Sequence, residues 1–468
     1  MIHLSLTVVI FFYSLINKIA KQENMIKRLL FIFGSIACIV NGAAGQTPLS
    51  LSQCIDSALQ NSLQIRSDNY DLDKTKAAIG QAYSSLLPSV NASGSYQYQF
   101  KVPVQLIPAE VFGGQEGKYQ AAQFSVPQSK SLSLDVSQPL FNASSLIALK
   151  AAKVAVNLNQ LQIQSSREDL VYNVSATYFN IQSILRQAEL DMNNLDNTEA
   201  LLTSTTDQFK AGLATQTDVD RLTVSRDNTK ASLENSLNSL EKQYNLLKLL
   251  MNVPMGSSMS IQQEEYTSEK FNLEAPLSDP EQKTNYLQVM ENKHIADLER
   301  RNIKAGYLPT LTLSGNAGYS GYYSNANPFK NLNDKWYSSS SVSLKLSVPI
   351  FDGFNKKYQI KQKAIEIKQY DVKAEQTRQQ NIKDVADAYA DLKSNFVTLQ
   401  TQQRNLALAQ KVLADVNIQY KSGIAKVTDV LNSQSELYSA QNNYINALIS
   451  IRKADLDLKK AQGLLLNK

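Results

Sequence analysis

The stretch QFKAGLATQTDV at residues 208–219 recurs 211 positions later as QYKSGIAKVTDV at residues 419–430, with seven of the twelve residues identical and no gap. Two further pairs of short segments repeat upstream in the same order: LPSV at 87–90 with LPTL at 308–311, and SQPLF at 137–141 with SVPIF at 347–351. A duplicated unit constrains architecture more tightly than a single motif. The chain is therefore expected to hold a first structural repeat at 46–252, a linker at 253–278 and a second repeat at 279–468.

Both repeats are expected to have the same order of elements: a helix, two strands and a long helical hairpin. Only 17 Gly and 12 Pro occur in 468 residues, which favours long helices. Alternation of apolar and polar residues predicts strands at 90–100, 131–139, 311–323 and 341–348, with loops at 101–129 and 324–337. Helices are predicted at 50–86, 147–210, 217–252, 279–305 and 355–421, and from after Gly423 to Leu466. The predicted fold class is α+β, mainly α.

The longest predicted helices cannot be buried in one compact core. A helix of about 65 residues is ~100 Å long at ~1.5 Å per residue, so it has to pack lengthwise against other helices. Apolar residues seven apart, the spacing of supercoiled helices, agree with such packing. They are Val430, Leu437, Tyr444, Ile451 and Leu458 in the second repeat, and Val219, Leu233, Leu240 and Leu247 in the first, with Arg226 at the missing step.

The N-terminal segment 1–45 is typical of a targeting signal. A basic pair follows Met25, a possible true start, and an apolar run at 29–40 leads to small residues before Gln46. Cys38 leaves open a lipidation site. The protein is therefore expected to be exported.

The four predicted strands indicate a membrane barrel shared between copies. Each has ~10 residues, the length that crosses an outer membrane when the strand is tilted. Four strands cannot close a barrel, since single-chain barrels begin at about eight, and an open sheet edge is not stable in lipid. Export, these strands and the long helices together predict an oligomeric channel extended by an α-helical tube.

Residues that carry chemistry are scarce after position 45. Cys54 and His294 are the single cysteine and histidine there, which argues against a disulfide framework and against a His-based metal site or triad. Cys54 is expected to be a buried, unreactive thiol. No phosphate-binding loop or nucleophile elbow is present. We therefore expect no enzyme activity, no cofactor and no metal.

The net charge does not indicate a nucleic-acid partner. The whole chain carries +5, and residues 1–45 account for +3 of it, which leaves the remainder near +2. A nucleic-acid-binding protein normally has a clustered basic face. No nucleic acid is therefore expected among the partners.

In these features the chain resembles the TolC family of Gram-negative outer membrane factors, the outer membrane efflux proteins. The resemblance covers about 46–468. It is carried by the Leu-Pro entries to two strands, by PIFDG at 349–353, and by the duplicated turn at 208–219 and 419–430. It implies a homotrimer with one 12-stranded β-barrel in the outer-membrane lipid and a helical tunnel in the periplasm.

The same resemblance implies a function and partners. Such a trimer docks onto a periplasmic adaptor (a membrane fusion protein) and an inner-membrane pump. It is the passive exit duct of a tripartite efflux or type I secretion system in the outer membrane of a Gram-negative bacterium. The alternative is a structural or adhesive coiled-coil envelope protein without a pore, which would not need alternating strands in both halves.

The resemblance places candidate functional residues at the two turns. The periplasmic tip and gate would contain Asp218, Asp429, Tyr420 and Asn432. Asn432 stands where the family has a second aspartate, and Ala425 where the family has an arginine, so the closing network is expected to differ. The helix-reversal and adaptor-facing residues are Lys210, Gly212, Leu213, Lys421, Gly423 and Ile424.

Each of these residues also has a purely structural interpretation. Gly212 and Gly423 suit a helix end, where a residue adopts a positive φ. Asp218 and Asp429 suit a first helical turn, where an acid interacts favourably with the helix dipole. Three copies would also bring these acids into a ring that favours cations. Both interpretations stay open, as do a membrane-interface role and simple loop packing for Trp336.

Overall fold

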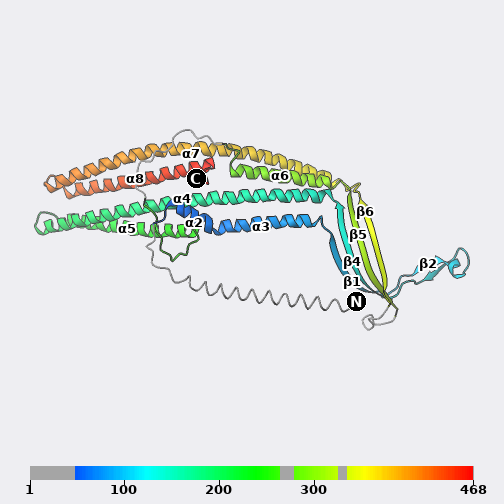
Figure 1. The fold of residues 1–468 in the computed structure, drawn as a ribbon. Coiled ribbons are helices and arrows are strands. Elements are labelled where there is room, and N and C mark those ends of the chain that lie inside the picture. Colours follow the sequence, from blue (N-terminus) through cyan, green and yellow to red (C-terminus); the bar gives the residue numbers. More distant parts are fainter. Residues whose placement is uncertain (1–47, 264–278, 325–334, 467–468) are drawn as a thin grey trace, which may run out of the picture. The chain divides into compact units, whose positions relative to one another are not determined.

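A computed structural model describes residues 48–263, 279–324 and 335–466 (Figure 1). The expected targeting segment 1–45, with Met25 and Cys38, lies outside the described residues, as does most of the expected linker. The chain separates into two compact units. In the smaller unit, Leu49 forms an isolated parallel bridge with Ile261.

The larger unit has the same order of elements twice. The first set comprises α3 Leu63–Ser84, β1 Ser89–Tyr98, β4 Gln128–Phe141, α4 Ala143–Lys210 and α5 Gln216–Leu250. The second comprises α6 Thr284–Ala305, β5 Thr310–Tyr323, β6 Tyr337–Ser347, α7 Asn355–Lys421 and α8 Val427–Gln462. Helix α2 (Leu51–Asn61) precedes the first set, and three short elements lie between β1 and β4: β2 Gln105–Pro108, η1 Ala109–Phe112 and β3 Tyr119–Ala122. The prediction of a mainly α fold with a small sheet is confirmed.

The four long strands form one antiparallel sheet in the order β1-β4-β5-β6. The register aligns apolar residues on one face: Ala92 with Leu134, Leu134 with Ala317, and Leu313 with Leu344. The other face is polar: Ser93 pairs with Ser133, Ser95 with Ser131, and Asn316 donates to Asp135 Oδ1 at 2.6 Å. Side chains on a strand alternate between faces, so the period-two pattern produces this separation directly.

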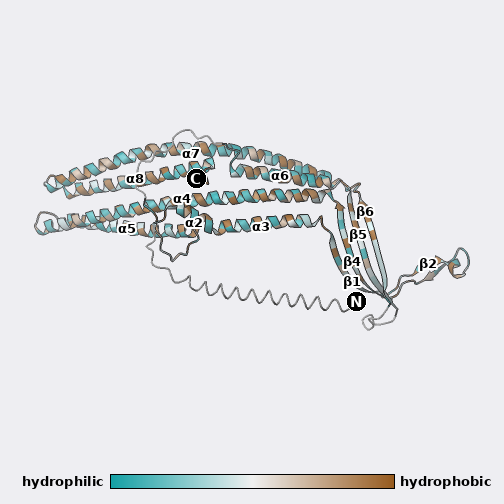
Figure 2. Cartoon of the chain, viewed as in Figure 1, coloured by the Kyte–Doolittle hydropathy of each residue, from teal (hydrophilic) through white to brown (hydrophobic). Residues whose placement is uncertain are grey.

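The long helices pack in pairs along their length. α4 packs on α5, and α7 packs on α8; α4 also contacts α3, α6 and α8. Hydrophobic and hydrophilic residues are interleaved along these helices, as Figure 2 shows. The sevenfold rows point inward as predicted, since Val430, Ile451 and Leu247 are fully buried. One buried cluster between α7 and α8 contains Ala388, Leu392, Ile451, Ala454, Leu458 and Ala461.

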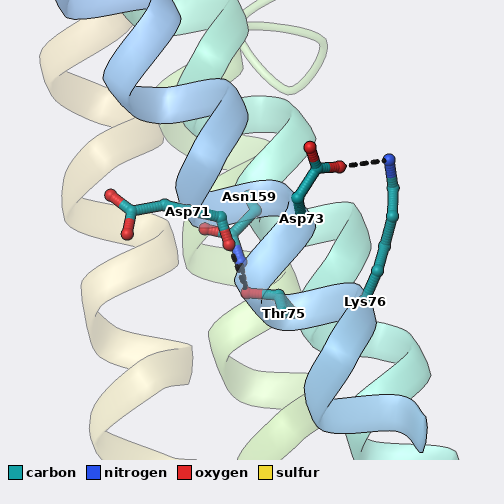
Figure 3. A network of polar contacts seen from close by, with 5 residues as sticks. All are labelled: Asp71, Asp73, Thr75, Lys76 and Asn159. Carbon is teal, nitrogen blue, oxygen red and sulfur yellow. Dashed lines mark hydrogen bonds and ion pairs between the residues drawn. The ribbon is translucent and has the colours of Figure 1, made fainter. Parts of the chain in front are cut away.

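Polar contacts also join neighbouring helices. On α4, the Asn159 side chain donates to the Thr75 hydroxyl of α3 at 2.6 Å (Figure 3). The Thr75 hydroxyl in turn donates to the backbone carbonyl of Asp71 at 2.9 Å. Asp73 and Lys76 form an exposed ion pair within α3, which contributes little to stability. The α3–α4 contact therefore includes a specific polar link.

The element bounds differ from the expected ones by a few residues at several ends, and three differences concern the elements themselves. The helix predicted at 50–86 is broken at Ser62, whose hydroxyl accepts from the N–H of Ile65 at 3.3 Å and so begins α3. The segment expected to be a loop at 101–129 contains a paired hairpin, β2 with β3. Strand β4 continues through Pro139, where the register with β5 shifts.

Candidate functional site

The first long hairpin reverses direction at Gly212, between α4 and α5 (Figure 1). Gly212 has a φ of +74°, a conformation that glycine adopts without a steric cost. The N–H of Leu213 donates to the carbonyl of Gln208 at 2.8 Å, and that of Gly212 to the carbonyl of Phe209 at 3.0 Å. These two bonds form a Schellman motif, which supplies partners to carbonyls at the end of a helix.

The second hairpin reverses at Gly423 with the same geometry. Gly423 has a φ of +72°. The N–H of Ile424 donates to the carbonyl of Gln419 at 2.9 Å, and that of Gly423 to the carbonyl of Tyr420 at 3.0 Å. The sequence repeat therefore produces a repeated backbone motif, and both glycines lie at the helix reversals.

An exposed apolar side chain follows each glycine. Leu213 is 79% exposed and Ile424 is 77% exposed. Lys210 and Lys421 end the preceding helices and are also exposed. Lys210 pairs with Asp207 at 3.0 Å, but water screens this pair on both sides. Each turn therefore presents a lysine and an aliphatic side chain to solvent.

Asp218 closes a capping box at the start of α5. Its carboxylate accepts from the N–H of Thr215 at 3.1 Å and from the Thr215 hydroxyl at 2.6 Å, while its own N–H donates to that hydroxyl at 3.2 Å. The hydrogen bonds from the side chain and backbone of Thr215 hold the pKa of Asp218 below its usual value. Asp218 thus has the structural role that its position predicts.

Asp429 occupies the same position in α8 but makes only half of this arrangement. Its carboxylate accepts from the N–H of Lys426 at 2.9 Å. Lys426 replaces the threonine of the first repeat, and its ammonium group cannot accept a hydrogen bond from the N–H of Asp429. Asp429 is exposed, and so is Asn432 three residues later. A carboxylate with fewer local bonds is freer to interact with solvent ions.

Tyr420 joins the two hairpins just before the second turn. Its hydroxyl donates to Gln208 Oε1 on α4 at 3.0 Å, and the hydroxyl of Thr205 lies 3.5 Å away. Thr205 is fully buried. Among the predicted gate residues, all of which lie in the described part of the chain, Tyr420 is therefore the one with a side-chain hydrogen bond between hairpins. The hydrogen bonds of Asp218 and Asp429 stay within their own turns in the described part of the chain.

Trp336 packs on a lysine at the start of β4. The ammonium group of Lys130 lies 4.7 Å from the ring centroid of Trp336 and 4.7 Å from that of Tyr323, within the range of a cation–π interaction. Tyr322 and Tyr337 make a tilted ring contact at 6.2 Å. Most of the loop expected at 324–337 lies outside the described residues.

Cys54 is fully buried in α2, and burial raises the pKa of its thiol to about 11. The prediction of a buried thiol is confirmed. In the described ranges, no three histidine, cysteine, aspartate or glutamate side chains come together as a metal site. Nor does any helix described here have the length and hydropathy to cross a membrane.

The family model for outer membrane efflux proteins matches residues 54–253 and 293–464. The chain belongs to this family. Outer membrane protein TolC of Escherichia coli is 22% identical over 423 residues, which cover 89% of this chain and 82% of that protein. TolC of Vibrio cholerae is 23% identical over 442 residues, covering 94% and 96%. The solved structure of VceC from Vibrio cholerae has a TM-score of 0.69 at 17% identity, covering 88% and 96%.

Membership of the outer membrane efflux protein family confirms several predictions. The protein is located in the outer membrane of a Gram-negative bacterium and extends into the periplasm. It is an exit duct for efflux, and proteins of this family are passive conduits rather than enzymes. The structural interpretation of the strands as part of a channel thus replaces the alternative of a coiled-coil protein without a pore.

Sequence reasoning missed a buried carboxylate that joins both hairpins of this efflux protein. Asp191 of α4 is fully buried. It accepts hydrogen bonds from Ser236 of α5 at 2.7 Å, from Tyr438 of α8 at 3.1 Å, and from Gln187 of its own helix at 2.8 Å. A buried charge is stable only where such bonds replace water. Asp191 is therefore a fixed junction between three helices.

A sequence signal for Asp191 exists. It lies in a sevenfold row of α4 whose other members are mostly short and polar: Thr177, Ile184, Thr198 and Thr205. Asp191 and the three threonines are buried. The row is not recognised as an apolar sevenfold row, since four of its five members are polar. A charged residue inside such a row indicates a buried polar contact.

Proposed function

We propose that three copies of this chain form one duct. Three sheets would close a 12-stranded barrel in the outer membrane, and the six long hairpins would form a tunnel through the periplasm. The observation that supports closure is the exposure of both edge strands. Every residue of β1 and of β6 is exposed, and each strand pairs on one side only. Unpaired edges of this length are ready to pair with another strand.

The two faces of the sheet suit such a barrel. The apolar face leaves Val90, Leu132, Val342 and Leu344 between 55% and 81% exposed, which suits contact with lipid. The opposite face carries serines, Asn316 and Asp135, which suits a water-filled lumen. In this arrangement β1 of one copy pairs with β6 of the next, and no open edge remains in the membrane.

The hairpin turns lie at the ends of α4 and α7 that are far from the sheet. Strand β4 leads into the start of α4 and β6 into the start of α7, and each turn follows the end of its helix. We assign them to the periplasmic tip of the duct. Leu213 and Ile424 provide exposed apolar contacts, and Lys210 and Lys421 surround them with positive charge. This surface suits docking of a periplasmic adaptor that links the duct to an inner-membrane pump.

The tip would also contain the gate. Tyr420 holds the second hairpin to the first through Gln208, so breaking this bond would free the second hairpin to move. Asp429 has one backbone partner and is exposed, and three copies would bring three such carboxylates to one constriction. A ring of carboxylates favours cations. Asp218 is satisfied within its capping box and contributes mainly to the start of α5.

Two measurements test this proposal together. The mass of the purified particle in detergent should equal three chains, and the particle should conduct as a single channel in a planar lipid bilayer. Multivalent cations added from the tip side should block the current. A stable monomer would refute the duct. So would a trimer that inserts into the bilayer but conducts neither as the wild type nor as the Tyr420→Ala variant.

A further inference from the structure

The segment that connects β1 to β4 has an ordered structure of its own. We call residues 99–127 the arm. At its base the N–H of Gln99 donates to the carbonyl of Pro127 at 2.7 Å, and beyond this β2 pairs with β3. Its turn is fixed by Glu110, whose carboxylate accepts from the N–H of Gly117 at 2.7 Å. A Cβ at Gly114 would lie 2.8 Å from that of Ala109, so the turn requires glycine there.

The surface of the arm is apolar. Seven large side chains are more than half exposed: Phe100, Val104, Leu106, Val111, Phe112, Tyr119 and Phe124. Phe100 reaches 93% exposure. Two lysines and two glutamates in the arm balance to zero net charge. Scattered apolar residues are normal on a surface, but seven large ones exposed within residues 99–127 are a concentration that indicates a contact site.

Lipid does not suit this surface. Strands β2 and β3 form a sheet of two strands, so in the described chain each has one edge whose backbone N–H and C=O groups face no other strand. Such a backbone is not stable in hydrocarbon, where no water replaces the missing hydrogen bonds. Glu110, Glu116 and Lys118 lie at or beside this turn and would add the cost of burying charge. The arm therefore needs a partner made of protein.

The position of the arm selects a second copy of this chain as that partner. It begins where β1 ends, and β1 is an edge strand that meets the next copy in the proposed trimer. A 12-stranded barrel with ~4.8 Å between strands and a tilt of ~40° has a radius of ~12 Å. The four residues of β2 alone extend over ~13 Å. An arm of this length reaches its symmetry-related copies.

We propose that the arms of three copies pack their apolar side chains against one another at the outer end of the barrel. This inference rests on the proposed trimer and adds a second interface, remote from the tips. The contact between arms covers Leu106, Val111 and Phe112, which are 70%, 70% and 58% exposed within one chain.

Cysteine cross-linking tests the contact directly. Cys54 is fully buried, so once the expected targeting segment with Cys38 is removed, an introduced cysteine is the accessible thiol. In intact outer membranes, a bis-maleimide too short to span the barrel should join Phe112→Cys chains. Since one thiol per copy links only two copies of three, about two thirds of the chains should shift to a covalent dimer. Ser95→Cys, on the barrel wall, should give no dimer.

The outcomes separate the inference from the proposed function. A wild-type trimer in which Phe112→Cys gives no dimer overturns the contact between arms and leaves the duct intact. A fluorophore at Phe112→Cys that brominated lipid quenches overturns the contact in favour of lipid. A particle that is not a trimer overturns both.

A second variant measures the stability that the contact provides. Leu106→Ser, Val111→Ser and Phe112→Ser together should lower the temperature at which the purified trimer dissociates by about 5 °C or more. The matched control, Gln105→Ser with Gln120→Ser, replaces exposed polar side chains of β2 and β3 in the same arm and should leave that temperature unchanged. Equal shifts in the two variants would contradict the contact.

Discussion

Replacing Tyr438 by phenylalanine removes one hydroxyl group from the contact between the two helical hairpins. That hydroxyl donates to Asp191, which is fully buried. A hydrogen bond to a charged group contributes about 1.5–3 kcal/mol, and the carboxylate keeps its bonds from Ser236 and Gln187. We therefore expect Tyr438→Phe to weaken the packing of α8 on α4 by about 2 kcal/mol, without changing the volume of the aromatic ring.

Amide hydrogen exchange measures this change locally. Opening of one helix pair exposes its amides without global unfolding, and 2 kcal/mol corresponds to about 30-fold faster exchange. Peptides from α4 around Asp191 and from α8 around Tyr438 should show this acceleration, and peptides from α6 should not. Tyr444→Phe is the matched control, because Tyr444 lies on the same helix and, within the described structure, its hydroxyl has no hydrogen bond.

A double-mutant cycle then isolates the pair. Asp191→Ala with Tyr438→Phe should cost less than the two single changes added together, because both singles remove the same bond. Strict additivity would contradict a direct interaction. Unchanged exchange in Tyr438→Phe, or equal acceleration in Tyr444→Phe, would refute the junction itself.

Three further predictions concern the turns. Gly423→Ala should destabilise the second hairpin by about 1–2 kcal/mol in thermal unfolding, since its φ is +72°; Gly80→Ala, in an open helical position, should not. Asp218→Asn should cost about 1 kcal/mol at neutral pH. The lowered pKa of Asp218 means that its stabilisation is complete above the unfolded pKa of ~3.9 and is lost as pH falls through the folded pKa, so the variant should lose this acid dependence. Asp429→Ala should weaken the block of single-channel current by multivalent cations, and an unchanged block would leave Asp429 with its contact to Lys426 alone.

The repeated and periodic parts of the sequence predict the structure well. The turn segment recurs, and both copies form the same Schellman motif at Gly212 and Gly423. Strand alternation predicts the two faces of the sheet, and the sevenfold rows predict Leu247 and Ile451 as buried residues. In each case many residues give the same signal, so the loss of one, such as Arg226 in its row, does not change the prediction.

Features that depend on one residue or on short segments were not predictable in the same way. The break before α3 depends on the hydroxyl of Ser62, in a stretch otherwise compatible with one helix. Strands β2 and β3 have four residues each, too few for alternation to be distinguished from a loop rich in proline and glycine. Asp191 is polar, and its burial depends on donors from two other helices that sequence does not bring together.

The row of short polar residues on α4, from Thr177 to Thr205, determines how the hairpins can separate. Parting two leucine-lined helices exposes apolar surface to water, and the free-energy cost rises with every helical turn that is exposed. Parting helices lined by threonines costs less, because the hydroxyls of Thr177 and Thr198 donate to carbonyls of their own helix, at 2.7 and 2.8 Å, and keep these bonds as the helices part. Water therefore hydrates such an interface as it opens. In the proposed duct, the hydrogen bonds of Asp191 and Tyr420 to neighbouring helices would supply much of the resistance along this row, so the hairpins would part there while each helix stays intact.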